Sequence, residues 1–277
     1  MTDVRDEVAN ATATDQQRGN SRGDFIWYEL MTTDPRGAKA FYDTVVGWNI
    51  SEGAPEFNGY RMIGRTDGGQ AGGVLPLTEE MQQHGARPMW LGYLGVEDVD
   101  AAVGSIERAG GKAMMPAFDI PNIGRIAMVT DPQGVPLYVM KPIPPAGQED
   151  KRSDVFSPSA EQRVGWNELA TTDQAAALEF YTSEFGWDKG DAMPMGDLGD
   201  YQFINQHGTM LGAIMTAAPG NAARWRFYFR VPDTDAAAVR VKAAGGVVAH
   251  GPMEVPGGDR ILIGTDPQGA EFALVGK

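Results

Sequence analysis

The segment WYELMTTD at residues 27–34 returns as WNELATTD at residues 166–173, 139 residues further along the chain. The same offset relates FY at 41–42 to FY at 180–181, and GW at 47–48 to GW at 186–187. Near the end of each copy, TDPQG at 130–134 returns at 265–269, with an offset of 135. Two nearly constant offsets over this length indicate a duplicated domain.

The 277 residues suit two domains of about 120 residues each, close to the common domain size. We expect a first domain at 23–141 and a second at 163–277. Residues 1–22 are polar and predict a disordered tail. Residues 142–162 hold four prolines among charged and small residues, which is typical of a linker between domains.

The composition excludes several classes of function. A net charge of −14 argues against binding to a nucleic-acid backbone or an anionic membrane, since both attract positive charge. The absence of cysteine excludes disulfides, thiolate metal sites and thiol nucleophiles. We find no apolar run long enough to span a membrane and no apolar stretch of a secretory signal near the N-terminus. These features predict a cytoplasmic protein.

Each copy is expected to begin with a strand, at 25–32 and 163–171, followed by a helix. Asp34 and Pro35 suit the cap and first position of that helix, and Ala38, Phe41 and Tyr42 fall on one apolar face. Each copy then predicts a second round of strand, helix and strands, so the fold class is α+β with two β-α-β-β-β modules per copy. The other predicted strands are 59–65, 70–76, 89–96, 124–129 and 135–140 in the first copy and 200–206, 209–216, 224–231, 259–264 and 270–275 in the second; the other helices are 99–108 and 234–243.

The chain resembles the vicinal oxygen chelate superfamily of glyoxalases, bleomycin-resistance proteins and extradiol dioxygenases. The resemblance rests on four features of each copy: a strand that ends in TTD, a helix that contains FY, a GW pair where that helix ends, and a late DPQG turn. The WxELxTTD opening is most similar to its tandem, glyoxalase-like or hydroxylase-like branch in mycobacteria and streptomycetes. The resemblance implies two tandem domains, each a curved, half-open mixed sheet around a cavity. It also implies a monomer in which the two domains pack as an internal pseudo-dimer, since single-copy relatives usually dimerise.

Metal-dependent members of the superfamily hold a divalent ion with His and Glu side chains. The resemblance places the corresponding positions at Trp27, about Leu91 and Tyr138 in the first copy and at Trp166, about Arg226 and Ala273 in the second. None of the six is a His or a carboxylate, and the three histidines lie in or near predicted turns. We therefore expect that the metal site is lost in both copies and that no cofactor is bound.

Glu29 and Glu168 are the candidate catalytic residues. Because side chains alternate along a strand, Trp27 and Glu29 share one face, as do Trp166 and Glu168. The resemblance assigns that face to the cavity, where a carboxyl group could anchor a ligand or act as a general base. The alternative is a structural Glu that pairs with an arginine such as Arg125 or Arg260.

Aromatic and cationic side chains supply the candidate ligand-binding residues. A tyrosine in a cavity wall offers a polar tip on an apolar body, although the same residue also suits ordinary strand packing. The loop at 79–84, which ends in His84, could act as a flap over the first cavity. The full candidate set is Trp27, Tyr60, Tyr93, Tyr138, Trp166, Tyr201, Arg226 and Tyr228.

Three functions of different class fit the sequence. The first is a protein that binds a small, mainly apolar molecule in aromatic-lined cavities without a metal. The second is a lyase, isomerase or hydroxylase-type enzyme that uses Glu29 or Glu168 as a general base. The third is an interaction protein that has kept the fold and filled its pockets.

Overall fold

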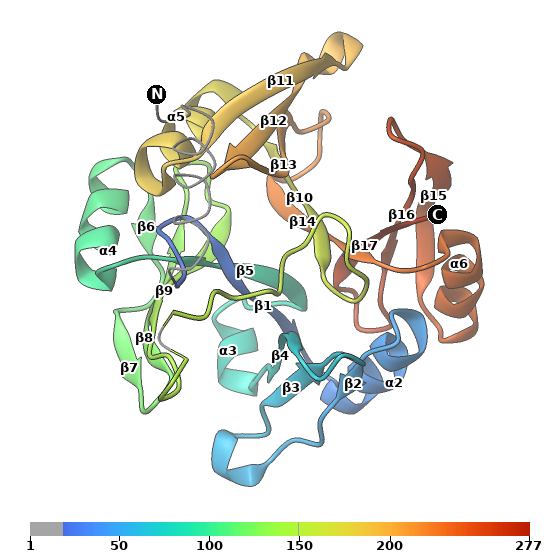
Figure 1. The fold of residues 1–277 in the computed structure, drawn as a ribbon, viewed down its shortest axis with the longest axis horizontal. Helices are drawn as coiled ribbons and strands as arrows, with labels where there is room; N and C mark the ends of the chain where they lie inside the picture. The colour runs from blue at the N-terminus through green and yellow to red at the C-terminus, as the bar shows by residue number, and fades with distance from the viewer. Residues whose placement is uncertain (1–18, 149) are drawn as a thin grey trace, which may run out of the picture.

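Each sequence copy forms one open, mixed β-sheet in the computed structural model, which describes residues 19–148 and 150–277 (Figure 1). The elements of the first copy are β1 (Phe25–Thr32), α2 (Pro35–Val45), β2 (Asn49–Ile50), η1 (Pro55–Phe57), β3 (Arg61–Gly64), β4 (Gln70–Pro76), α3 (Glu79–Gln83), β5 (Met89–Gly95), α4 (Val99–Arg108), β6 (Lys112–Ala113), β7 (Phe118–Ile120), β8 (Gly124–Thr130) and β9 (Pro136–Pro142). Those of the second are β10 (Val164–Thr171), α5 (Gln174–Phe185), β11 (Asp188–Pro194), η2 (Gly196–Leu198), β12 (Asp200–Gln206), β13 (Thr209–Thr216), β14 (Arg224–Arg230), α6 (Thr234–Ala243), β15 (Val247–Glu254), β16 (Arg260–Thr265) and β17 (Glu271–Gly276).

The sheets share one topology. The first has the order β2-β3-β4-β1-β5-β9-β8-β6, with β7 paired to β8, and the second has the order β11-β12-β13-β10-β14-β17-β16-β15. In each sheet the first strands of the two modules lie side by side and antiparallel, as β1 and β5 or β10 and β14. The predicted α+β class and the two β-α-β-β-β modules per copy are confirmed.

Local signals in the sequence place the helices correctly. The Asp34 carboxylate accepts hydrogen bonds from the backbone N–H groups of Arg36 and Gly37 and so caps α2. Asp173 caps α5 in the same way, and α5 ends at Gly186, whose positive φ of 70° suits a glycine. The apolar face predicted for α2 is buried.

The DPQG turns join the two copies. Each is a tight turn in which the glycine N–H donates to the aspartate carbonyl, at 3.0 Å in both Asp131–Gly134 and Asp266–Gly269. The Tyr42 hydroxyl of α2 donates to Asp266 of the second copy at 3.1 Å. Reciprocally, the Tyr181 hydroxyl of α5 donates to Asp131 of the first copy at 3.2 Å. The two repeated motifs therefore meet across the copies.

Tryptophans extend both contacts into the sheets. Trp90 Nε1 donates to the Tyr42 hydroxyl at 2.9 Å, and Trp225 Nε1 donates to the Tyr181 hydroxyl at 3.1 Å. Burial raises the pKa of Asp131 and of Asp266, and the hydrogen bonds that each accepts work against this rise. The two buried carboxyl groups therefore depend on the tyrosine hydroxyls of the other copy.

A contact between equivalent residues marks the axis that relates the copies. The Tyr28 hydroxyl donates to Asn167 Oδ1 at 2.8 Å, and these two residues hold the same position in β1 and β10. In a symmetric dimer, only residues on the two-fold axis contact their own equivalents. Figure 1 shows α2 packed beside α6, and α4 beside α5, so each helix pair joins different copies. The domains thus pack as an internal pseudo-dimer around a shared core.

Both segments that flank the first domain make contacts. Arg22 donates to the backbone carbonyl of Glu184, and Trp187 Nε1 donates to that of Gly23. Val155, within the expected linker, is buried in the shared core. Residues 1–18 of the expected disordered tail lie outside the described residues.

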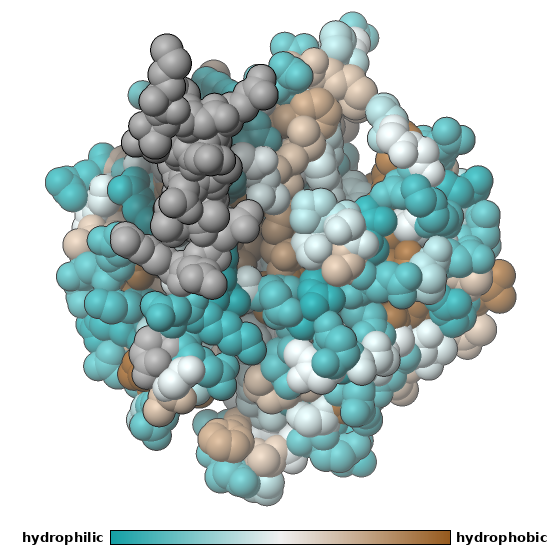
Figure 2. Space-filling model, viewed as in Figure 1, coloured by the Kyte–Doolittle hydropathy of each residue, from teal (hydrophilic) through white to brown (hydrophobic). Residues whose placement is uncertain are grey.

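The surface is mainly hydrophilic on the face shown in Figure 2, as the net charge of −14 leads one to expect. Among the helices within 19–148 and 150–277, none has the length and apolar character needed to cross a membrane.

We expect Tyr42→Phe to lower the free energy of unfolding by about 1–3 kcal/mol, because Asp266 loses a donor and Trp90 loses an acceptor inside the core. Tyr181→Phe should have a similar effect. Urea unfolding measures both, with Thr44→Ala on the exposed side of α2 as the control. Equal stability of Tyr42→Phe and the control would show that the contact between the copies is not stabilising.

Candidate functional site

Three aromatic residues lie side by side on the face of the first sheet that carries Glu29. We call this face, and the matching face of the second sheet that carries Glu168, the concave faces. Trp27 on β1 is paired with Tyr93 on β5, which is paired with Tyr138 on β9. The rings of Tyr93 and Tyr138 stack, with centroids 4.3 Å apart. Two residues further along β1, Glu29 is paired with Leu91. The structure thus brings together the first-domain candidates that the sequence suggested.

Glu29 is the polar centre of this face. The Tyr93 hydroxyl donates to Glu29 Oε2 at 3.0 Å. The Tyr60 hydroxyl accepts a hydrogen bond from Trp27 Nε1 at 3.0 Å and lies beside the same carboxyl group. Tyr60 fits there because Gly73, the neighbour of Glu29 on β4, has no side chain; a Cβ on Gly73 would lie 1.9 Å from the Tyr60 hydroxyl.

The second oxygen of Glu29 has no partner. Glu29 is only 3% exposed, and its Oε1 is buried without a hydrogen bond. Burial raises the pKa of Glu29 to about 7, although hydrogen bonds from Tyr93 and Tyr60 lower it. Glu29 takes part in no ion pair among the described residues. The site therefore holds a carboxyl group poised between its neutral and ionised forms.

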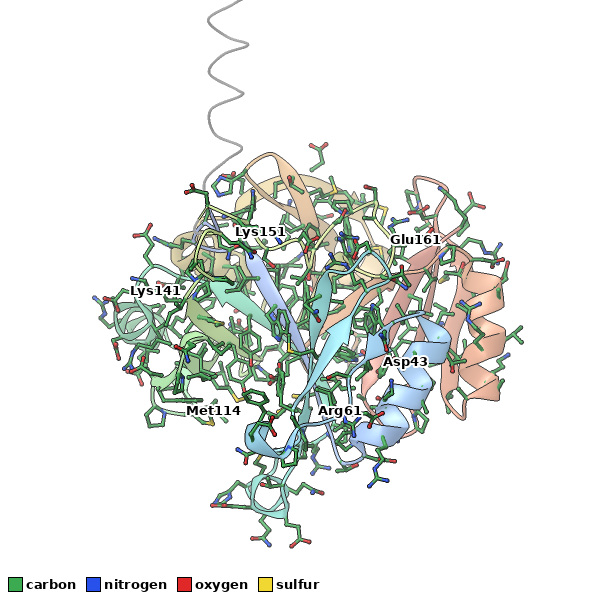
Figure 3. All side chains as sticks on the ribbon, turned by 60° about the horizontal axis from the view of Figure 1, so that its bottom comes forward. Asp43, Arg61, Met114, Lys141, Lys151 and Glu161 are labelled. Atoms are coloured by element: carbon green, nitrogen blue, oxygen red, sulfur yellow. The ribbon has the colours of Figure 1, made fainter. Side chains whose placement is uncertain are left out.

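Apolar side chains surround and cover this carboxyl group. Leu91, Ile126 and Met140 are buried on the same face, and Met81 of α3 packs against them. Figure 3, in which the bottom of Figure 1 comes forward, shows many side chains between the labelled Arg61 and Met114, and Glu29 itself is buried. The first site is therefore closed by its own side chains, and α3 forms part of its cover.

The second sheet repeats this arrangement with one decisive change. Tyr201 and Tyr228 donate to Glu168 Oε2 at 2.8 and 3.0 Å, and Trp166 Nε1 donates to the Tyr201 hydroxyl at 2.8 Å. Arg226, which occupies the place of Leu91, donates to Glu168 Oε1 at 2.5 Å. Both oxygens of this carboxylate are satisfied.

The ion pair continues to the edge of the second site. Arg226 Nε donates to Glu271 Oε1 at 2.9 Å, and Arg224 Nε donates to the same oxygen at 2.8 Å. Burial alone would raise the pKa of Glu271, but hydrogen bonds from Arg224 and Arg226 outweigh it and hold that pKa below its usual range. Ala273 replaces Tyr138 beside Tyr228. The second face is therefore charge-compensated and lacks the ring of Tyr138.

The cover also differs between the domains. The offset between equivalent residues falls from 140 at Pro76 and Thr216 to 135 at Met89 and Arg224, so the second copy is five residues shorter between β13 and β14. The missing residues are those that form α3 in the first copy. The change of offset seen in the sequence therefore reflects the presence of α3, and within residues 19–148 and 150–277 only the first site has a helical cover.

The family follows from a comparison of sequence profiles. The model for the "Glyoxalase/Bleomycin resistance protein/Dioxygenase superfamily" matches residues 25–139 and 163–274. The chain belongs to this superfamily.

Two relatives match this chain over nearly the whole length of both proteins. It is 32% identical to "Putative glyoxylase CFP32" of Mycobacterium tuberculosis, over 90% of this chain and 93% of the relative. It is 29% identical to the anthracycline biosynthesis protein DnrV of Streptomyces peucetius, over 90% and 91%. The fold is also similar to that of the Mn(II)-bound glyoxalase of Novosphingobium aromaticivorans, with a TM-score of 0.62 and 18% identity. The match covers 92% of this chain and 83% of the glyoxalase.

The side chains at the positions that the resemblance compares with metal ligands are not ones that bind a divalent ion. Trp27, Leu91 and Tyr138 supply no carboxylate or imidazole, and in the second domain Arg226 brings a positive charge to the same place. Within the described ranges, no three His, Asp or Glu residues are grouped so that they could hold an ion. Glu29 alone is too few ligands for a divalent cation.

The histidines lie outside both concave faces. His84 caps the end of α3, and His207 lies in the turn between β12 and β13; both are exposed. His250 is also exposed, but it lies on β15 rather than in a turn. None contacts Glu29 or Glu168.

One expected pairing is wrong. Arg125 forms ion pairs with Asp100 and Asp119, and Arg260 with Asp235, so neither neutralises a concave-face glutamate. The partner of Glu168 is Arg226 instead. The sequence held a usable signal, because the resemblance places Arg226 at a cavity position of the second domain and places Glu168 on the face of that cavity.

We expect Glu29→Gln to raise the free energy of unfolding at pH 8 by about 3 kcal/mol, at about 1.4 kcal/mol per pKa unit. The unfolded chain loses the Glu29 proton near pH 4.5, whereas the folded chain loses it near pH 7. The protonated Glu29 therefore contributes its full stability below pH 4.5, and this contribution is lost as the pH rises from 4.5 to about 7. At pH 5 the difference should be below about 1 kcal/mol.

Urea unfolding at both pH values tests this prediction. Glu168→Gln is the matched comparison: it leaves the Arg226 guanidinium with only Glu271 and should destabilise the protein by about 2–3 kcal/mol at pH 8. If the stability difference between wild type and Glu29→Gln does not change with pH, Glu29 has no raised pKa in the folded protein.

Proposed function

We propose that the chain binds a small, mainly apolar organic molecule on the concave face of its first domain, without a metal ion. The observation that supports this most directly is the unpartnered, buried oxygen of Glu29, because buried polar groups in folded proteins are nearly always hydrogen-bonded. A ligand that reaches Glu29 would satisfy it. The surrounding rings and methionines offer the apolar surface that small-molecule sites use.

The cover over Glu29 suggests how the site works. Met81 and the segment around α3 close the first site, and an unbranched methionine can adopt several shapes at little cost. A ligand would displace this cover and take the place of its side chains against Trp27 and Tyr138. The second domain, whose carboxylate is already paired with Arg226, would serve mainly to hold the first in place.

A thermal-shift screen with small aromatic and polycyclic compounds tests ligand binding. The set should include an anthracycline, since the relative DnrV is named for anthracycline biosynthesis. We expect a compound that raises Tm of the wild type, quenches the fluorescence of Trp166→Phe, and fails to quench that of Trp27→Phe. A ligand whose quenching requires Trp166 instead would assign binding to the second domain.

Native mass spectrometry before and after a chelator tests the absence of a metal. We expect one species near the chain mass of 29.8 kDa, unchanged by the chelator. The same spectrum tests the proposal that the two-domain chain is a monomer, because the contact of Tyr28 with Asn167 already provides the axis of a dimer. A chelator-sensitive mass of one or two divalent ions would overturn the metal-free proposal.

Acid–base catalysis by Glu29 is the second candidate function. A general acid or base works best when its pKa lies near the working pH, and burial raises the pKa of Glu29 to about 7. The reaction would be of the lyase, isomerase or hydroxylase type. Glu168 is less suited, because both of its oxygens already accept hydrogen bonds, from Arg226, Tyr201 and Tyr228.

If turnover of any such substrate is found, Glu29→Gln should lower kcat by about 10²–10⁴. The wild-type rate should change with an apparent pKa close to 7, and Glu168→Gln should retain that profile. An unchanged kcat in Glu29→Gln would leave ligand binding as the role of this residue.

A further inference from the structure

The second domain shows which group can bind the second oxygen of a glutamate on this face. Glu168 and Glu29 occupy the same position. Oε2 of Glu29 accepts from the Tyr93 hydroxyl, and Oε2 of Glu168 accepts from the hydroxyls of Tyr201 and Tyr228. In the second domain the Arg226 guanidinium is bound to Oε1. In the first domain the residue at that position is Leu91, and Oε1 has no partner. At Oε1 of the glutamate, the difference between the two sites is therefore the presence of a cation.

The groups around Glu29 are suited to a cation that comes from outside the chain. The titratable groups that face it are the hydroxyls of Tyr60, Tyr93 and Tyr138, from three different strands or their ends, and all three pKa values are raised by burial, so the hydroxyls stay neutral. Together with Trp27, they place four aromatic rings around one carboxyl group. Aromatic rings attract organic cations through their negative faces.

We propose that the ligand of the first domain is an organic amine, whose ammonium group binds Glu29 Oε1 where Arg226 binds Glu168 in the second domain. This inference rests on the proposed binding function and names its ligand class. A desolvated carboxylate is stabilised strongly by an adjacent cation, so the amine and the ionised Glu29 would stabilise each other. A metal ion would find one carboxylate among rings, whereas an ammonium needs only a few acceptors and ring faces.

Two further features favour an amine. The net charge of −14 attracts cations to the protein and repels anionic ligands. The second site cannot accept the same ligand, because Arg226 already occupies both Glu168 and Glu271. We therefore expect one amine per chain, despite the two copies of the domain.

Calorimetry with matched pairs of compounds tests the inference on the full chain at pH 8. The pairs are 2-phenylethylamine with 2-phenylethanol and tryptamine with tryptophol, which differ in the ammonium group alone. We expect each amine that binds to do so at least tenfold more tightly than its alcohol, with a stoichiometry of one. Glu29→Gln should reduce the affinity for the amine to that for the alcohol.

Two more variants separate the amine site from general effects. Leu91→Arg introduces the guanidinium found in the second domain and should abolish amine binding; a far-UV spectrum checks its folding, and Glu29→Gln tests the same contact independently. Glu56→Gln, on the exposed η1, removes a carboxylate elsewhere and should not change the affinity.

The outcomes distinguish a failure of the amine inference from a failure of the proposed binding function. Equal affinity for amine and alcohol in the wild type would overturn the amine inference and leave the binding function intact. Amine binding that survives Glu29→Gln would also overturn it. If neither member of any pair binds, the amine inference fails, and the thermal-shift screen with neutral compounds then decides whether the first domain binds a ligand at all.

Discussion

The structure depends on the reciprocal contacts between each α-helix tyrosine and the buried aspartate of the other copy. Asp131 and Asp266 hold their own turns through backbone hydrogen bonds, and each also accepts a hydroxyl hydrogen from the opposite domain. Neither carboxyl group would be stable in the core without these donors. The turns, the two helices and the tryptophans behind them therefore form one unit, which fixes how the two sheets face each other.

Once the sheets are fixed, each concave face must accommodate a glutamate on its first strand. Burying a carboxyl group is costly unless it is paired or protonated, and the two copies meet this constraint differently. Arg226 forms an ion pair with Glu168, whereas Glu29 lies among tyrosines, and burial raises its pKa to about 7. Duplication makes this division possible, because the glutamate of one copy can be paired while that of the other copy stays unpaired.

Much of the fold was predictable because its signals are local. Strand alternation, the Asp34 and Asp173 caps and the glycine stop act within a few residues, and the strands and helices lie close to the expected ranges. The sequence did not predict the short or exposed strands β2, β6, β7, β11 and β15, since they have little apolar pattern. Helix α3 was expected as a loop; its five residues are held by the Thr78 cap and by packing on the concave face.

The sequence by itself determined that there are two copies and that each has the superfamily's sheet. It also determined that Trp27 shares a strand face with Glu29, and Trp166 with Glu168 at the matching positions of the second copy. Repeats and strand periodicity are properties of the chain, so they can be read without the structure. Only the tertiary structure decided that Tyr42 contacts Asp266 in the other copy and that Arg226, rather than Arg260, neutralises Glu168. Those pairings depend on strand register and domain packing, which bring together residues that are far apart in the chain and have no local signal of their meeting.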